Sequence, residues 1–449
     1  TTSVGPFVDG VYDPHNVELI LSGNNTTITA TNSAGSESGS SNTFTVNPAA
    51  ADADSSTISV SADTLIADGS SQSIITVQLK DEFGNYLTSG GETVVISRTG
   101  TGVLSSTTDN GDGTYSATLT APNDVGSADI SATVNASSIT SGDPEIVYTF
   151  DELSTFLVEI SGGGSISTQT AGVSFDLRIT AQDAFNNTVT TFDETVQITS
   201  SGTFDSGSGT TASFTSGILD PHSVTLTSVG STTISARKTA STESGTSNSF
   251  TINPGSADET TSTITSSESF LQNDGADQTQ ITVQLKDEFG NNLTAGGDAV
   301  TLSTTAGTLS DADGGTAGNQ PADNLDGTYT ATLTASSSIE TATITGTLNA
   351  VSIADAEVVK ITQFNIWDGS DSGGNPAGRS DWGNTGRWSL GSLPSTGQVV
   401  LIESGQTYYP IIDGEDPVID FLSIELGATV TLSGRTITIN NEISGDGSF

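Results

Sequence analysis

The chain has 449 residues, a formal net charge of −43 and no Cys or Met. This acidity argues against nucleic acid as a partner, because Lys and Arg contacts to phosphate drive that binding, and it disfavours docking on anionic lipid. The lack of Cys excludes disulfides, thiol nucleophiles and cysteine-based metal clusters. Secretion with calcium binding and a high-salt habitat explain the acidity equally well. No apolar run is long enough to insert into a membrane.

The composition predicts an all-β fold. Gly occurs 50 times, and Thr, Val and Ile favour a pleated backbone, whereas no long segment has helical apolar periodicity. Hydrophobic residues make up 33% of the chain, a share that suits small domains with thin cores. At roughly 100–200 residues per domain, the length predicts about three or four domains.

The first complete repeat, called type B here, spans 51–150 and returns at 256–363. Both copies contain ITVQLKDEFGN, at 75–85 and 281–291, and then DNGDGTYSATLTA (109–121) or DNLDGTYTATLTA (323–335). Because the order of landmarks is kept, the repeated unit is a whole module. The second copy carries an insertion near Asp311–Gln320, which predicts a lengthened loop.

A second repeat, called type A, spans 151–255, and residues 1–50 match its C-terminal half. LRITAQDAFNN (177–187) aligns with the eleven-residue string, so Asp81, Asp183 and Asp287 are 102 and 104 residues apart. A unit of about one hundred residues has the size of an immunoglobulin-like β-sandwich. The missing first half predicts either a fragment of a longer polypeptide or completion by a neighbouring molecule in a head-to-tail fibre.

The repeated string predicts a strand followed by a structural turn rather than a catalytic motif. Apolar and polar residues alternate up to Leu79; then Asp81 can accept from backbone N–H groups while Gly84 and Asn85 tolerate positive φ. We expect Phe83 to fold back as a plug of the core. The same structural roles are predicted for Asp183, Phe185, Asp287, Phe289 and Asn291.

The second landmark predicts a tyrosine corner. Tyr115 begins a late strand just after a turn, and Tyr329 repeats it in the second type B module. Aligning DPHSVTLT with DGTYSATLT places His222 at the position of Tyr115, so we expect its ring nitrogen to bond to the backbone rather than to act as a metal ligand or general base.

These landmarks resemble bacterial Ig-like repeats of the invasin and intimin type, and more distantly the filamin repeats. The resemblance rests on V-x-L-K-D-E-F-G-N, D-G-T-Y-x-A-T-L-T-A and the last alternating strand, VGSADISATV (125–134). It covers both type B modules well and the type A modules loosely. It implies stiff spacers in surface adhesins.

Four acidic residues are candidate calcium ligands. Asp109 with Asp112, and Asp323 with Asp326, are spaced by three and followed by Gly, so they could wrap Ca²⁺ or simply form turns. The turn is the favoured interpretation, because no complete EF-hand-like loop is present. No other cofactor is predicted.

Residues 364–449 differ in composition and hold all three Trp residues. A Trp-containing approach, W-x-x-G-x-x-P-x-x-G-x-x-V-x-I, leads into short alternating strands that resemble the first rungs of a β-helix, or β-solenoid, of large secreted bacterial proteins. The expected inward residues are Ile424, Val430, Leu432, Ile437 and Ile439. Trp382 and Trp388 either cap this core or form stacking platforms for a glycan.

Together these features predict tandem immunoglobulin-like sandwiches followed by a β-helix-like segment, in a non-enzymatic, extracellular rod for adhesion, surface display or fibre formation. Its partners would be copies of itself, or glycans or proteins on host or neighbouring cells. The alternative is the spacer of a secreted enzyme that acts on polysaccharide, or of a glycan-binding protein, whose active part lies in or beyond the β-helix.

Overall fold

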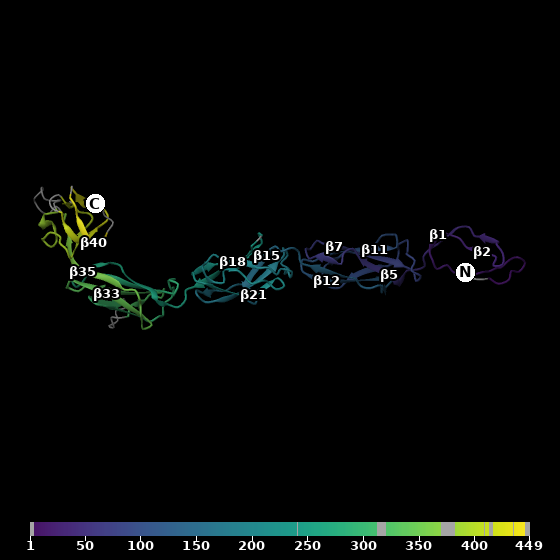
Figure 1. The fold of residues 1–449 in the computed structure, drawn as a ribbon, viewed down its shortest axis with the longest axis horizontal. Coiled ribbons are helices and arrows are strands. Elements are labelled where there is room, and N and C mark those ends of the chain that lie inside the picture. Colours follow the sequence, from purple (N-terminus) through teal and green to yellow (C-terminus); the bar gives the residue numbers. More distant parts are fainter. Residues whose placement is uncertain are drawn as a thin grey trace.

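The computed structural model is all-β, with its sandwiches following one another along the long axis of Figure 1. Among the described residues, no helix has the length and hydropathy needed to span a membrane. The predicted loop insertion at 311–320 falls almost wholly outside the described residues. The structure describes residues 4–239, 241–311, 320–369, 382–407, 409–412, 416–433 and 435–444.

Residues 51–150 form two packed sheets. The strand order is β10-β11-β7-β5 in one sheet and β13-β12-β14-β6 in the other, with β9 on β11 and β8 on β12. Inward residues alternate as the sequence predicts, so Ile75, Val77 and Leu79 are buried in a single core. The strands are β5 (Asp52–Val60), β6 (Thr64–Ile66), β7 (Gln72–Lys80), β8 (Val94–Arg98), β9 (Val103–Leu104), β10 (Thr108–Asp109), β11 (Thr114–Thr120), β12 (Gly126–Val134), β13 (Ser137–Ser138) and β14 (Glu145–Thr149).

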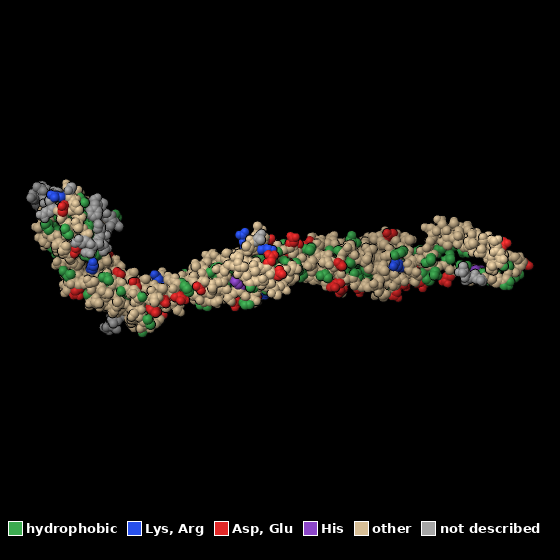
Figure 2. Space-filling model, in the orientation of Figure 1, with side chains coloured by type: hydrophobic (Ala, Val, Ile, Leu, Met, Phe, Trp, Pro, Cys, Tyr) green, Lys and Arg blue, Asp and Glu red, His purple; other side chains and the backbone are tan. Residues whose placement is uncertain are grey.

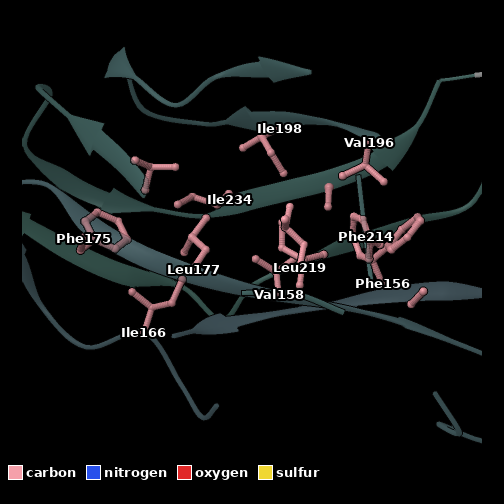
Figure 3. Packing of buried hydrophobic residues seen from close by; sticks show 14 of the residues in the cluster. Phe156, Val158, Ile166, Phe175, Leu177, Val196, Ile198, Phe214, Leu219 and Ile234 are labelled. Carbon is pink, nitrogen blue, oxygen red and sulfur yellow. The ribbon is translucent and has the colours of Figure 1, made fainter. Parts of the chain in front are cut away.

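Residues 151–255 repeat this plan. The order β15-β17-β21-β19 faces the two short sheets β16-β25-β22 and β20-β18-β23-β24. Aromatic rings, among them Phe156, Phe175 and Phe214, interlock in the core that Figure 3 shows. The strands are β15 (Thr155–Ile160), β16 (Gln169–Thr170), β17 (Phe175–Gln182), β18 (Val196–Ser200), β19 (Phe204–Ser206), β20 (Gly209–Thr210), β21 (Ile218–Leu226), β22 (Gly230–Thr232), β23 (Ile234–Lys238), β24 (Ser244–Thr246) and β25 (Phe250–Asn253).

Residues 256–363 form the next sandwich. One sheet has the order β26-β28-β32-β30, with β31 on β32, and the other contains β29-β33-β35, with β27 on β35 and β34 on β33. The strands are β26 (Asp258–Ser266), β27 (Phe270–Gln272), β28 (Gln278–Lys286), β29 (Val300–Thr304), β30 (Thr308–Asp311), β31 (Ala322–Asp323), β32 (Thr328–Thr334), β33 (Glu340–Leu348), β34 (Val351–Ser352) and β35 (Glu357–Ile366).

In each of these three sandwiches the last strand runs parallel to a short strand near the start. Strand β14 pairs with β6, β25 pairs with β16, and β35 pairs with β27, whereas the remaining pairs within the sandwiches are antiparallel. The last strand of each sandwich is therefore a hydrogen-bonded neighbour of its second strand.

The C-terminal strands stack in parallel on β35. The order β35-β36-β38-β40 continues one sheet, and β37 pairs with β39 in a second, parallel pair. Ile424 and Val430 are buried as expected, whereas Leu432 is 39% exposed, which corrects the prediction that it faces inward. The elements are a 3₁₀ turn (Thr385–Arg387), β36 (Gln398–Ile402), β37 (Ile411–Ile412), β38 (Val418–Ile424), β39 (Thr431–Leu432) and β40 (Thr438–Ser444).

The N-terminal segment holds two small hairpin-like pairs and little core. Strand β1 pairs with β4, and β2 pairs with β3. Val17 and Leu19 are exposed, while the matching Val224 and Leu226 of 151–255 are buried. The strands are β1 (Gly23–Thr26), β2 (Thr29–Thr31), β3 (Ser38–Ser40) and β4 (Phe44–Val46).

Candidate functional site at the junctions between sandwiches

The repeated Asp closes a turn and at the same time holds the preceding linker. Asp81 is almost fully buried. Its Oδ1 accepts from the backbone N–H groups of Phe83 (3.0 Å) and Asn85 (2.9 Å), and its Oδ2 accepts from the N–H of Ala49 (2.9 Å). The carboxylate thus joins the end of β7 to the linker before β5.

The same arrangement recurs at the next two junctions. Oδ2 of Asp183 accepts from the N–H of Asp151 at 3.0 Å, and Oδ2 of Asp287 accepts from the N–H of Gly255 at 3.0 Å. The linker residue precedes its Asp by 32 positions in all three cases. The junction is therefore a repeated structural element.

An Asn four residues after each Asp reaches across the boundary. Nδ2 of Asn187 donates to the carbonyl of Asn123 (2.8 Å), and its Oδ1 accepts from the N–H of Val125 (3.1 Å). This side chain also donates to Oδ2 of Asp183 at 3.0 Å. One amide therefore fixes a turn of the preceding sandwich to the carboxylate of its own.

The other two Asn residues make equivalent contacts. Nδ2 of Asn85 donates to the carbonyl of Ile20 (2.8 Å), and its Oδ1 accepts from the N–H of Ser22 (2.9 Å). Nδ2 of Asn291 donates to the carbonyl of Thr227 at 2.7 Å. We call each Asp and Asn pair, with its linker and turn partners, a junction clasp.

The prediction that Phe83 plugs the core is wrong. Phe83 is 43% exposed and Phe289 is 39% exposed, because the alternation of the strand stops at the Asp and the turn carries the ring to the end of the sandwich. Phe185 is half-buried. The ring of Phe289 lies against Gly172 of the preceding sandwich, where a Cβ would come within 2.4 Å of it. This Phe therefore belongs to the junction.

The clasp carboxylates are held in the charged form. Burial opposes the charge of Asp81, Asp183 and Asp287, but hydrogen bonds from the Asn side chain and from three backbone N–H groups outweigh burial and lower the pKa of each. Figure 2 shows acidic side chains spread along the whole visible face, with few basic ones. The charges in the clasps are stabilised by N–H donors rather than by cations.

The candidate calcium ligands already accept hydrogen bonds from nearby N–H and hydroxyl groups. Oδ1 of Asp109 accepts from the N–H of Gly111 (2.9 Å), and Oδ2 accepts from Gly91 (2.9 Å). Asp112 accepts from the N–H and hydroxyl of Thr114, and hydrogen bonds with Thr328 lower the pKa of Asp326 as those with Thr114 lower that of Asp112.

Asp323 makes the same contacts as Asp109. Its Oδ1 accepts from the N–H of Leu325, and its Oδ2 accepts from the N–H of Gly297. Within the described part of the chain, no three His, Cys, Asp or Glu side chains gather as a metal site would require. The N–H and hydroxyl groups around these carboxylates therefore fit a role as turn formers.

In each type B module one tyrosine closes a corner over the nearby loop. The hydroxyl of Tyr115 accepts from the N–H groups of Gly91 (3.1 Å) and Glu92 (2.9 Å). The hydroxyl of Tyr329 accepts from Gly297 (3.1 Å) and Asp298 (2.9 Å). Both rings are buried and tie the start of a strand to the opposite sheet.

The alignment that placed His222 at the position of Tyr115 is wrong, because another residue occupies that position in the sheet. Tyr115 lies opposite Val77, and the residue that aligns with Val77 is Ile179. Leu219 lies opposite Ile179, because the register of β17 and β21 shifts just beyond it. The place of the tyrosine is thus taken by Leu219.

His222 still bonds to the backbone. It lies opposite Leu177, and its Nε2 donates to the carbonyl of Gly207 over 2.8 Å. This contact joins β21 to the turn between β19 and β20, which is a structural role.

The three tryptophans form one buried cluster. Trp367, Trp382 and Trp388 are 0%, 5% and 3% exposed, and their rings meet edge to face at 4.8–5.1 Å. Nε1 of Trp388 donates to the carbonyl of Trp382. Since a sugar needs an exposed ring face, this burial excludes Trp382 and Trp388 as glycan platforms and gives them a core role.

The comparisons with known proteins agree with the repeat. The family model of invasin domain 3 matches residues 52–149 and 258–364. Both type B modules are thus similar to invasin domain 3. No curated protein matches the chain.

Solved structures resemble the chain more weakly. The Escherichia coli adhesin FdeC is 20% identical, with 71% of this chain and 100% of that chain covered and a TM-score of 0.39. Yersinia pseudotuberculosis InvD is 20% identical, with coverage of 68% and 97% and a TM-score of 0.36. Invasin, a bacterial integrin-binding protein, is 15% identical, with coverage of 70% and 61% and a TM-score of 0.34.

Sequence reasoning missed the function of the Asn residues, including Asn187, and their partners in the preceding sandwich. The available signal was the constant spacing of four between Asp and Asn in all three copies. That spacing marks a turn, but it does not reveal that the turn lies at a boundary.

Proposed function

We propose that this chain is a stiff, non-enzymatic spacer of an extracellular adhesive protein on a bacterial surface. The observation that carries the proposal is the junction clasp, which recurs with the same atoms at three boundaries. The invasin domain 3 match of both type B modules supports an adhesin context. A spacer of this kind holds a binding end away from the cell.

The modules of this spacer would be a partial module at 1–50 and complete ones at 51–150, 151–255 and 256–363. Four separate clusters of buried residues support these boundaries, because one lies within each of 51–150, 151–255, 256–363 and 364–449. Residues 364–449 would form the fifth unit, the first rungs of a β-helix. The parallel pairing of β36, β38 and β40 supports that assignment.

Stiffness would come from short linkers that are held at the clasp. Each linker donates one N–H to the Asp, and the Asn bonds to the preceding turn, so bending must break several hydrogen bonds together. Small-angle scattering of the full chain tests this. The variant Asn85→Ala/Asn187→Ala/Asn291→Ala should shorten the maximum dimension, whereas an unchanged scattering curve would contradict the proposal.

Its partner would be a protein or glycan of a host or neighbouring cell, or further copies of the chain in a head-to-tail fibre. The exposed apolar residues of 1–50 support self-assembly, because the equivalent residues of 151–255 are buried. Light scattering of the full chain over a range of concentrations separates the two. If the chain stays strictly monomeric and binds cells, the partner is a protein or glycan of another cell.

A further inference from the structure

One strand belongs to two structural units at once. The first half of β35, Glu357–Ile361, pairs antiparallel with β33, and Lys360–Thr362 pair with β27. Its second half, Gln363–Ile366, pairs in parallel with β36. The sheet of the sandwich therefore continues without a linker into the C-terminal stack, unlike the three clasped boundaries.

Side chains reinforce this continuity. Phe421 on β38 meets Phe270 on β27 edge to face, with ring centroids 4.7 Å apart. Lys360 places its Nζ 3.9 Å from the centroid of the Phe421 ring. Phe421 is buried, so a strand two places along the stack is anchored on the sandwich.

The loop between the first two parallel strands is also tied down. The hydroxyl of Thr362 donates to the carbonyl of Gly397 at 2.7 Å, immediately before β36 begins. Asn365 is fully buried, donates to the carbonyl of Ser392 (3.1 Å) and accepts from the N–H of Leu390 (3.3 Å). The strand β35 thus positions the chain that returns to pair with it.

We infer that the sandwich of residues 256–363 is the template and N-terminal cap of the parallel stack that follows it. Gln363 and Gln398 are 35 residues apart, so their pairing closes a long loop before any stacking contact forms. A preformed β35 supplies the first edge and covers the end of the stack, which parallel repeats require. The stack therefore folds only on a folded sandwich.

This inference rests on the observed pairing and does not depend on the proposed function. It predicts that the stack loses its structure when the sandwich does. The tryptophans make this measurable in the full chain, because all three of them lie in the stack and are buried. Their emission reports the stack and none of the sandwiches.

The test places a charge in the sandwich core, far from the stack. Leu302→Asp alters β29, which β33 separates from β35 in the sheet, and Leu302 is 2% exposed. Ile96→Asp is the matched control, since Ile96 occupies the equivalent strand of 51–150 and is 5% exposed. A buried charge without a partner destabilises the sandwich that holds it.

Urea unfolding of each full chain is then followed by tryptophan emission and by hydrogen exchange of the core strands β7 and β28. We expect Leu302→Asp to move the β28 and tryptophan transitions together to lower urea. Ile96→Asp should move only the β7 transition. A tryptophan transition that stays in place while β28 unfolds would overturn the inference, as would a tryptophan transition that moves in Ile96→Asp.

Discussion

The side chain of Asn187 is bonded at both of its polar atoms to residues of the preceding sandwich, at the carbonyl of Asn123 and the N–H of Val125. A bidentate amide fixes orientation as well as distance, because both atoms must stay aligned with the same turn. The boundary between these sandwiches is therefore a specific contact rather than a flexible link.

Asn187→Ala should loosen this boundary without unfolding either sandwich. It removes two bonds across the boundary, each worth roughly 0.5–1.5 kcal/mol net. Because the chain has no Cys, spin labels at Val95→Cys and Leu157→Cys, two exposed positions, report the angle between the sandwiches. We expect a broader distance distribution in the variant.

The neighbouring Asn186 provides the matched control. Asn186→Gly changes an exposed residue at a φ of 72°, a conformation that glycine adopts freely. This variant should keep the narrow distribution of the parent chain. Equal broadening in both variants would show that the turn, and not the amide across the boundary, sets the angle.

Acid should open the same boundary. The clasp lowers the pKa of Asp183 below its ordinary 3.8, so the charged carboxylate favours the closed clasp. Its contribution is complete above pH 3.8 and is lost as the pH falls through the lowered pKa. The distance distribution should broaden in that acid range, and circular dichroism should check that the sandwiches remain folded. A narrow distribution down to the pH of unfolding would contradict this.

Removing the tyrosine hydroxyl should destabilise one sandwich. Tyr115→Phe leaves the N–H of Glu92 without its acceptor, whereas the N–H of Gly91 keeps Asp109, and the cost should be roughly 1–3 kcal/mol. Urea unfolding of 51–150, followed by hydrogen exchange of β7, should show the loss. Tyr86→Phe, at an exposed ring, is the control and should change nothing. Equal stability of both variants would show that the hydroxyl of Tyr115 does not stabilise this sandwich.

Chelation of divalent cations should leave the melting temperature unchanged. The oxygens of Asp109 and Asp112 already accept from donors of their own turn and from the N–H of Gly91, which a calcium ion would have to displace. Calorimetry with and without a chelator measures this. A melting temperature that falls with the chelator and returns with calcium would contradict the interpretation of these residues as turn formers.

Local pattern predicted the parts of this molecule that depend on neighbours in sequence. The alternation of Ile75, Val77 and Leu79 and the turn at Asp81 follow from period and propensity. The place of Phe83 could not be predicted, because an aromatic after a turn can face its own core or the neighbouring module. Only the three-dimensional contact between neighbouring modules decides which of the two the ring faces.

The same limit explains the displaced histidine. A register shift in β21 carries His222 away from the position that a gap-free alignment gives it. The partners of the Asn residues were hidden for a similar reason, since they lie 62–65 positions away in another sandwich. Spacing in the sequence marked the clasp but did not show what it holds.

The parallel pairing of the second and last strands has a mechanical consequence. A pull on the two ends of residues 51–150 draws β6 towards its N-terminus and β14 towards its C-terminus, so the strands must slide past each other. The bonds of Ala67 to Thr149 and of Val147 to Asp63 are then strained simultaneously instead of parting one by one. The pairing of β6 with β14 therefore resists tension along the line that joins the two ends of residues 51–150.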